Sequence, residues 1–268
     1  MINDWQAEAL NTAPDSPNEI HGDQLAQQFG FKGGLVPGVT ISAYLIHPAV
    51  ETWGMAFLEK GKAHVTVRKP LYDGDTFTVR ILSSSDSTYQ AELVRSDGVT
   101  SASAEVSIEG DAPAPLTRLG APIAACEYAG TPASPAAWEK LRQEGCLAFR
   151  YPWGSQARMK TYLRNELQMP ELLCGTRPYA NMGFLLGISN WVLAGNAHMN
   201  PWVHLETSSQ NYRPVPWGTS VIGEMEVRDY YEKRGHRFVD ADVALYDEAD
   251  DSCLSSISLR AIYQLRGA

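Results

Sequence analysis

With 268 residues, the chain is long enough for one large domain or two of ordinary size, and its 44% of hydrophobic residues supply a full core without metal or disulfide support. A net charge of −9 disfavours nucleic acid as a partner, because a basic face supplies most of that affinity. No stretch approaches the ~18 apolar residues that a membrane span needs, and the first residues do not resemble a signal peptide. The four cysteines form no CxxC pair and fit no zinc pattern, so we expect reduced thiols, no bound metal and a cytoplasmic protein without membrane contact.

The first half begins with two segments of helical character. Residues 22–30 carry apolar side chains at helical spacing, and Gly30 is a typical helix stop. After a glycine-rich turn, residues 39–58 are apolar on nearly every side, which predicts a buried helix in which Pro48 starts a new turn or a kink. From Gly61 the apolar period changes to two, which predicts antiparallel strands over 62–70, 76–83, 87–96 and 99–109.

The second half repeats this order after a break. Residues 111–137 are rich in Pro, Ala and Gly, which predicts a connector that runs over the surface. Residues 138–173 contain short helical pieces, one of them from Met159 to Leu167. An apolar helix is predicted over 182–194, and strands are predicted near 202–213, 219–231, 236–247 and 253–265.

A short motif recurs at the same strand-to-strand turn of both halves. Lys69-Pro70, followed by Gly74, matches Arg213-Pro214, followed by Gly218, at an offset of 213 − 69 = 144 residues. The motif and the repeated order of elements predict a duplicated α+β unit. We therefore expect an N-terminal unit over 1–110, the connector over 111–137 and a C-terminal unit over 138–268.

A long buried helix wrapped by an antiparallel sheet, twice in one chain, resembles the double hotdog fold. The segment Asn18-Glu19-Ile20-His21, followed by Pro37-Gly38, resembles the hydratase loop of MaoC-like (R)-specific enoyl-CoA hydratases and dehydratases, and this resemblance covers residues 15–109. The loop of that family reads Asp-x-Asn-Pro-x-His. In this chain Ser16 stands at the aspartate position, and Asp15 precedes it by one residue.

The resemblance implies the addition of water to an enoyl thioester, or the reverse reaction. His21 would be the acid and base, assisted by Asn18 and by Asp15 as the nearby carboxylate. The N–H groups of Gly38 and Val39, at the start of the buried helix, would hold the thioester oxygen as it gains negative charge. The substrate would be an acyl-CoA or a similar thioester, so that coenzyme A is part of the substrate and no separate cofactor is needed.

Other residues offer different chemistry. His204 and Glu206 are two apart on a predicted strand, so they would share one face and could act together. Glu51 lies on the first buried helix, where some hotdog thioesterases carry a catalytic carboxylate. Asn190 occupies a similar place in the second helix, which suggests that the C-terminal unit is a supporting one. His236 lies in a basic hairpin, which would either hold the phosphates of coenzyme A or be a polar turn.

Three functions remain open at this point. The first is a hydratase or dehydratase that uses His21, and the second is a hotdog thioesterase that uses Glu51 or the pair of His204 and Glu206. The third is an acyl-binding protein without catalysis. Since hotdog units pair edge to edge and double hotdogs often pair again, we also expect a homodimer.

Overall fold

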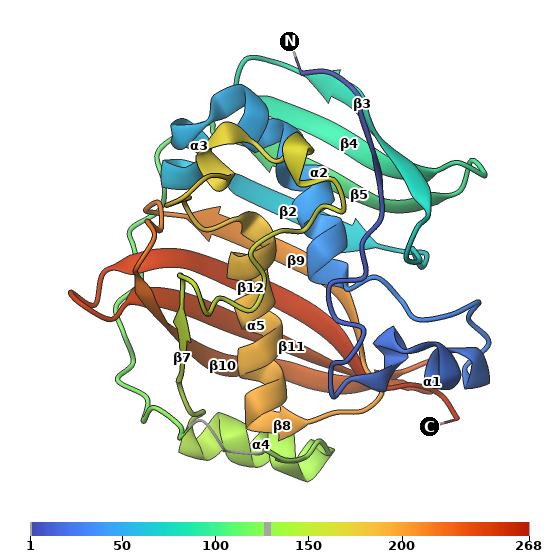
Figure 1. The fold of residues 1–268 in the computed structure, drawn as a ribbon. Helices are drawn as coiled ribbons and strands as arrows, with labels where there is room; N and C mark the ends of the chain where they lie inside the picture. The colour runs from blue at the N-terminus through green and yellow to red at the C-terminus, as the bar shows by residue number, and fades with distance from the viewer. Residues whose placement is uncertain (1, 126–129, 268) are drawn as a thin grey trace.

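The computed structural model describes residues 2–125 and 130–267, so that Cys126 and part of the predicted connector, 126–129, lie outside the described residues. One ten-stranded antiparallel sheet dominates the fold, with the strand order β1-β3-β4-β5-β2-β9-β12-β11-β10-β7. The two long helices, α2 and α5, pack against each other and lie side by side on one face of this sheet (Figure 1). The α+β class predicted from the sequence is confirmed.

The helices and strands account for most of the chain. The helices are α1 (Asp23–Gln28), α2 (Gly38–Trp53), α3 (Met55–Lys60), α4 (Pro135–Glu144) and α5 (Met182–Asn196), with short 3₁₀ turns at Glu19–His21, Glu166–Gln168 and Glu171–Leu173. The strands are β1 (Trp5–Glu8), β2 (Lys62–Val67), β3 (Thr76–Ser84), β4 (Thr88–Arg95), β5 (Thr100–Ser107), β6 (Thr131–Pro132), β7 (Phe149–Pro152), β8 (Ala197–His198), β9 (Val203–Asn211), β10 (Ser220–Lys233), β11 (His236–Asp247) and β12 (Cys253–Gln264).

The first long helix is buried almost throughout, as its apolar sequence predicts. Every residue from Gly38 to Val50 is buried. Pro48 does not end α2; the break comes instead at Gly54, which has a φ of +52° and separates α2 from α3. Glycine adopts this backbone conformation without the steric cost that a side chain would add, so the helix stops there.

An internal twofold relation connects the two halves. Helices α2 and α5 begin at residues 38 and 182, and strands β3 and β10 begin at 76 and 220, so both pairs differ by 144. Strands β2 and β9 join the halves, and His64 stands opposite Ser208 in their register. These two residues also differ by 144, so the local twofold axis passes between equivalent positions. The two units therefore share one continuous sheet, and neither leaves an open edge at the junction.

Four segments differ from the sequence-based expectations. Strands β1 and β7, at the outer edges of the sheet, were not predicted, because each is only four residues long. Residues 159–165 are not helical, since Asn181 binds the carbonyl oxygens of Met159 and Lys160 and holds the chain in a loop. Helix α4 begins inside the predicted connector, where the Ser134 hydroxyl accepts the N–H of Ala137 and Pro135 occupies the first turn.

A buried carboxylate holds part of the connector against the sheet. Glu224 on β10 is 1% exposed, and its oxygens accept hydrogen bonds from the Arg118 guanidinium and from the N–H groups of Leu119 and Ala121. This pairing satisfies a charge that would otherwise be costly to bury. Within residues 2–125 and 130–267, we find no helix whose length and apolar character would suit it to cross a bilayer.

Candidate active site

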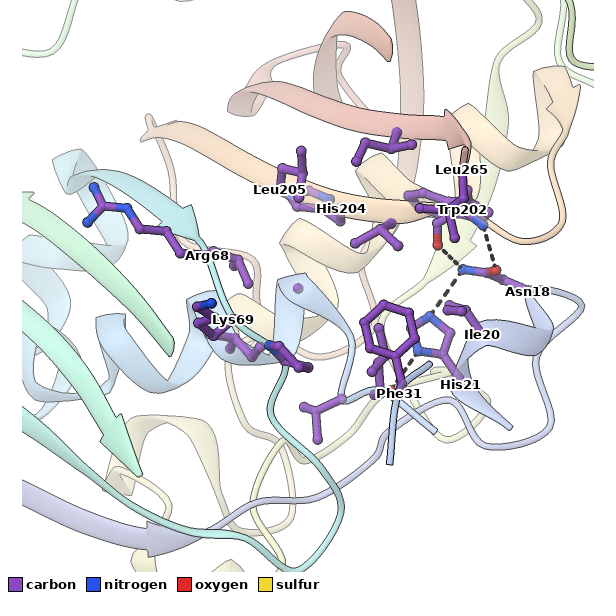
Figure 2. A pocket seen from close by; sticks show the side chains of 18 of the residues that line it. Asn18, Ile20, His21, Phe31, Arg68, Lys69, Trp202, His204, Leu205 and Leu265 are labelled. Atoms are coloured by element: carbon purple, nitrogen blue, oxygen red, sulfur yellow. Dashed lines mark hydrogen bonds between the residues drawn. The ribbon is translucent and has the colours of Figure 1, made fainter. Parts of the chain in front are cut away.

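A mostly apolar cavity of about 250 Å³ lies where the two units meet (Figure 2). The first unit contributes the 3₁₀ turn at Glu19–His21, the start of α2 and the end of β2, and the second contributes α5, β9 and the ends of β11 and β12. The lining residues are Asn18, Ile20, His21, Phe31, Leu35, Val36, Gly38, Ile41, Val67, Arg68, Lys69, Pro70, Asn190, Trp202, Val203, His204, Leu205, His236, Ile262 and Leu265. The C-terminal unit therefore supplies eight of these twenty residues, beyond the supporting role expected from the sequence.

His21 presents one basic ring nitrogen at this cavity. Its Nδ1 lies 2.7 Å from the carbonyl oxygen of Leu35, which only accepts, so Nδ1 carries the proton and Nε2 carries the lone pair. Burial lowers the pKa of His21, and the hydrogen bond to Leu35 opposes this effect in part. The imidazole is therefore neutral, and its Nε2 lone pair faces the Asn18 Nδ2 amide at 3.3 Å, a longer contact than that at Nδ1, which a water must share or displace before Nε2 acts as a base.

Asn18 holds this imidazole and joins the two units. Its Nδ2 lies 3.3 Å from His21 Nε2 and donates a 2.9 Å hydrogen bond to the carbonyl oxygen of Trp202, while its Oδ1 accepts the Trp202 N–H at 3.1 Å. Both bonds to Trp202 cross from the first unit to the second. An amide is the group required here, because a carboxylate could not donate to the Trp202 carbonyl.

Gly38 lies at the wall of the cavity, at the N-terminus of α2. Neither its N–H nor that of Val39 has an acceptor among the described residues, as expected for the first turn of a helix. A Cβ at Gly38 would lie 3.0 Å from both Cβ and the carbonyl oxygen of His204. The glycine is therefore required for helix–strand packing as well as for access by a ligand. Val39 is buried beside it but does not line the cavity.

His204 forms a buried chain of hydrogen bonds next to Gly38. Its Nδ1 lies 2.7 Å from Asn190 Oδ1 on α5, and its Nε2 lies 2.5 Å from the Thr207 hydroxyl. Burial lowers the pKa of His204 to about 4, so this imidazole is neutral. Because both nitrogens are engaged, His204 orients its neighbours and is not placed to take up a proton.

The predicted pairing of His204 with Glu206 is wrong. The register between β9 and β12 shifts at this point: Glu206 is opposite Arg260, and His204 is opposite the next residue, Ala261. This β-bulge leaves Leu205 unpaired and turns His204 and Glu206 to opposite faces. Glu206 lies on the outer face, where it forms an ion pair with Arg260 and its Oε1 is 3.6 Å from His64 Nε2.

Two other predicted carboxylates lie away from the cavity. Asp15 is exposed and is not among the residues that line it, so the position beside His21 is taken by the Asn18 amide. Glu51 is half-exposed near the end of α2, and its Oε1 lies 3.4 Å from Nε2 of the fully buried His47, without hydrogen-bond geometry. Burial raises the pKa of Glu51. Among the described residues, no acidic side chain lines the cavity.

Basic side chains from both units line the cavity. Arg68 and Lys69 are exposed, line the cavity and have no acidic partner among the described residues. His236 lines it from the β10–β11 hairpin, and its Nδ1 accepts the N–H of Arg266. In the same hairpin, Arg237 forms an ion pair with Glu232 and donates a hydrogen bond to the side-chain oxygen of Gln264. These groups could hold an anionic part of a ligand.

Sequence reasoning did not identify several residues of this site. Trp202 binds Asn18, 184 residues away, which no local pattern reveals. Thr207 binds His204, three residues away, across the bulge that breaks the alternation of the strand. Lys69 belongs to the turn that recurs as Arg213-Pro214, and Arg68 precedes it. Two adjacent cations at the end of a predicted strand were therefore a signal for an anion-binding position. No group of three or more metal-ligating side chains occurs within the described ranges.

Comparisons with known proteins support the fold. No family model matches the chain, and no curated protein matches it. A conserved hypothetical protein from Mycobacterium tuberculosis, described as having a double hotdog fold, is 10% identical with a TM-score of 0.59, over 96% of this chain and 93% of that one. The dehydratase domain of a mycocerosic acid synthase-like polyketide synthase is 13% identical with a TM-score of 0.53, over 98% and 92%.

A third match has another assigned activity. A protein from Lactobacillus plantarum, provisionally titled an oleoyl thioesterase, is 8% identical with a TM-score of 0.51, over 98% of this chain and 96% of that one. At such low identities, the three matches establish architecture alone. Together with the internal twofold relation, they show that this chain has the double hotdog fold.

Proposed function

We propose that the protein is a hydratase or dehydratase that acts on an enoyl or 3-hydroxyacyl thioester. The observation that carries this proposal is one shared cavity lined by both His21, a neutral imidazole, and Gly38, whose N–H at the start of α2 has no acceptor among the described residues. One group activates water, and the other binds an oxygen that gains charge.

The reaction follows from these two groups. In hydration, His21 Nε2 takes a proton from water as the water oxygen bonds to C3 of the enoyl group. The electron pair of the double bond moves toward the thioester oxygen, giving an enolate. The imidazolium then returns the proton to C2, and the neutral imidazole is restored. Dehydration is the reverse sequence, in which the hydroxyl leaves as water.

The Gly38 N–H stabilises the enolate oxygen. It is a preorganised donor at the positive end of a 16-residue helix, in a largely apolar cavity that screens charge weakly. In enzymes from which one such donor has been removed, kcat falls by roughly 10²–10³-fold.

A single imidazole performs both proton transfers in this proposal. No acidic side chain lines the cavity among the described residues, so no second acid is available from that source. Burial lowers the pKa of His21, which makes the imidazolium a stronger acid when it returns the proton.

A thioesterase is the second candidate. The same Gly38 N–H would bind the oxyanion formed when water, activated by His21, attacks the thioester carbonyl. The two candidates differ in the carbon that water attacks. In both, the exposed Arg68 and Lys69 would hold the phosphates of coenzyme A or of a carrier-protein arm. The expected cytoplasmic location and the homodimer remain predictions.

The two activities are separated with crotonyl-CoA and butyryl-CoA. A hydratase removes the enoyl absorbance of crotonyl-CoA without release of thiol, and His21→Gln abolishes this signal. Asp15→Asn, outside the cavity, is the matched control and retains activity. Release of thiol from butyryl-CoA favours the thioesterase. Absence of both signals across a panel of acyl thioesters rejects catalysis and leaves acyl binding.

A further inference from the structure

The buried Asn190 amide leaves one polar group unused in the cavity. Asn190 is 8% exposed and lines the cavity from the middle of α5. Its Oδ1 is paired with His204 Nδ1, whereas its Nδ2 has no hydrogen-bond acceptor among the described residues. The sealed polar atoms without a partner, among the described residues, are His47 Nε2 and Trp138 Nε1, so Asn190 Nδ2 keeps an opening to the cavity that this residue lines. Its place in the cavity wall points to a ligand acceptor.

The orientation of this amide is fixed by its hydrogen bond to His204, which Thr207 supports in turn. Asn190 Oδ1 only accepts, so its 2.7 Å contact places the ring proton on His204 Nδ1, and Nε2 then accepts the Thr207 hydroxyl at 2.5 Å. Thr207, His204 and Asn190 are all buried. Since Oδ1 must face the imidazole, Nδ2 is turned away from it.

Two donors thus flank one imidazole. His204 lies against the start of α2, where a Cβ at Gly38 would come within 3.0 Å of it, and it bonds Asn190 on its other side. In the proposed function, on which this inference rests, the N–H of Gly38 binds the thioester oxygen. The Asn190 donor then remains for a second oxygen of the same acyl group.

We infer that Asn190 Nδ2 binds an oxygen at C3 of the acyl chain, so that the site selects thioesters with an acceptor at C3 over those without one. In hydration this acceptor is the attacking water, and in dehydration it is the 3-hydroxyl. Asn190 supplies a hydrogen bond and no proton, so the proton balance of the reaction stays with His21. Thr207 and His204 act as positioning residues.

The test compares acetoacetyl-CoA, which has an oxygen at C3 and cannot lose water, with butyryl-CoA, which has none. Calorimetric titration of the wild-type chain should show tighter binding of acetoacetyl-CoA by about tenfold, the value of one hydrogen bond from a buried donor. Asn190→Leu should bring this ratio to about one while it retains the affinity for butyryl-CoA. Ser189→Ala, a buried neighbour on α5 whose hydroxyl binds Leu186 O and which does not line the cavity, should keep the wild-type ratio.

The positioning role has its own variants. Thr207→Val keeps the shape of the side chain but removes the hydroxyl, so the ratio should fall, and Thr207→Ser should restore it. Thermal unfolding of each variant confirms that it is folded.

Each remaining outcome contradicts a defined part of the argument. Equal binding of both thioesters by the wild-type chain overturns the C3 assignment, and so does an unchanged ratio in Asn190→Leu. An equal loss for both ligands in that variant would assign Asn190 to the thioester oxygen instead. If the wild-type chain binds neither compound, the proposed function itself fails.

Discussion

Replacement of Asn18 by aspartate tests the neutral amide–imidazole pair at the centre of the site. Asn18 Nδ2 lies 3.3 Å from His21 Nε2, so a carboxylate there would face the ring nitrogen. A negative charge favours the imidazolium, and the pKa of His21 should therefore rise. At this separation an effective dielectric of about 20 gives an attraction of roughly 5 kcal/mol. Desolvation of both groups reduces this value, so we expect a rise of about 1–3 units.

The shift is measured without reference to activity. The Cε1–H resonance of His21, assigned by its loss in His21→Gln, is followed by NMR between pH 4 and pH 9. In a rate profile, the acid limb of kcat/KM should move to higher pH by the same amount, because only the neutral imidazole acts as the base. Asp15→Asn should leave both curves unchanged. An unchanged or lower pKa of His21 in Asn18→Asp would refute the geometry described for this pair.

The same variant should also be less stable. A carboxylate oxygen would replace the Nδ2 donor that lies 2.9 Å from the Trp202 carbonyl, so two acceptors would face each other. The loss of this buried hydrogen bond should lower the free energy of unfolding by about 1–3 kcal/mol, as measured by urea denaturation.

Three further predictions concern stability. Gly38→Ala should lower the free energy of unfolding by about 1–3 kcal/mol, measured by urea denaturation, because the new Cβ meets the main chain of β9. Acidification below about pH 6.5 should destabilise the protein by up to about 1.4 kcal/mol per pH unit for each buried histidine, because the unfolded chain takes up the proton first. Burial lowers the pKa of His47 to about 3, so His47 contributes to this slope, and His47→Phe should reduce it. Glu224→Gln should cost about 2–4 kcal/mol and speed proteolysis of the connector, since it removes a buried charge that has three partners.

Each of these has a control. His198→Gln, at an exposed position, should leave the slope of stability against pH unchanged. Glu248→Gln, on the surface beside Arg150, should cost less than about 1 kcal/mol. Retained stability in Gly38→Ala would mean that β9 yields to the added methyl group. A pH-independent free energy of unfolding between pH 7 and pH 5 would contradict the burial of neutral histidines.

Much of the fold was readable from the sequence, because the apolar period and the turn residues determine it locally. The strand predicted over 236–247 has those bounds in the structure, and the 144-residue offset taken from two short turns also relates the starts of both long helices. The helix predicted from Met159 to Leu167 was wrong, because the helical spacing of its apolar residues is outweighed by Asn181, which binds the backbone of Met159 and Lys160 from a distant position in the chain.

The site was partly readable. His21, Asn18 and Gly38 do line one cavity, as the resemblance implied, although their catalytic roles remain predictions. The bulge at Leu205 could not be foreseen, because a bulge is defined by the partner strand and not by the alternation within β9. For the same reason His204 was assigned to the wrong neighbour.

The two hydrogen bonds between Asn18 and Trp202 have a consequence for how the halves stay together. They cross the junction at the wall of the cavity, so the walls exist as a pocket only while the units are docked. Any compound that fills the cavity therefore binds only the associated halves, and its binding free energy adds to the stability of their association. After cleavage of the connector, the two halves should then dissociate more slowly in the presence of the ligand than in its absence.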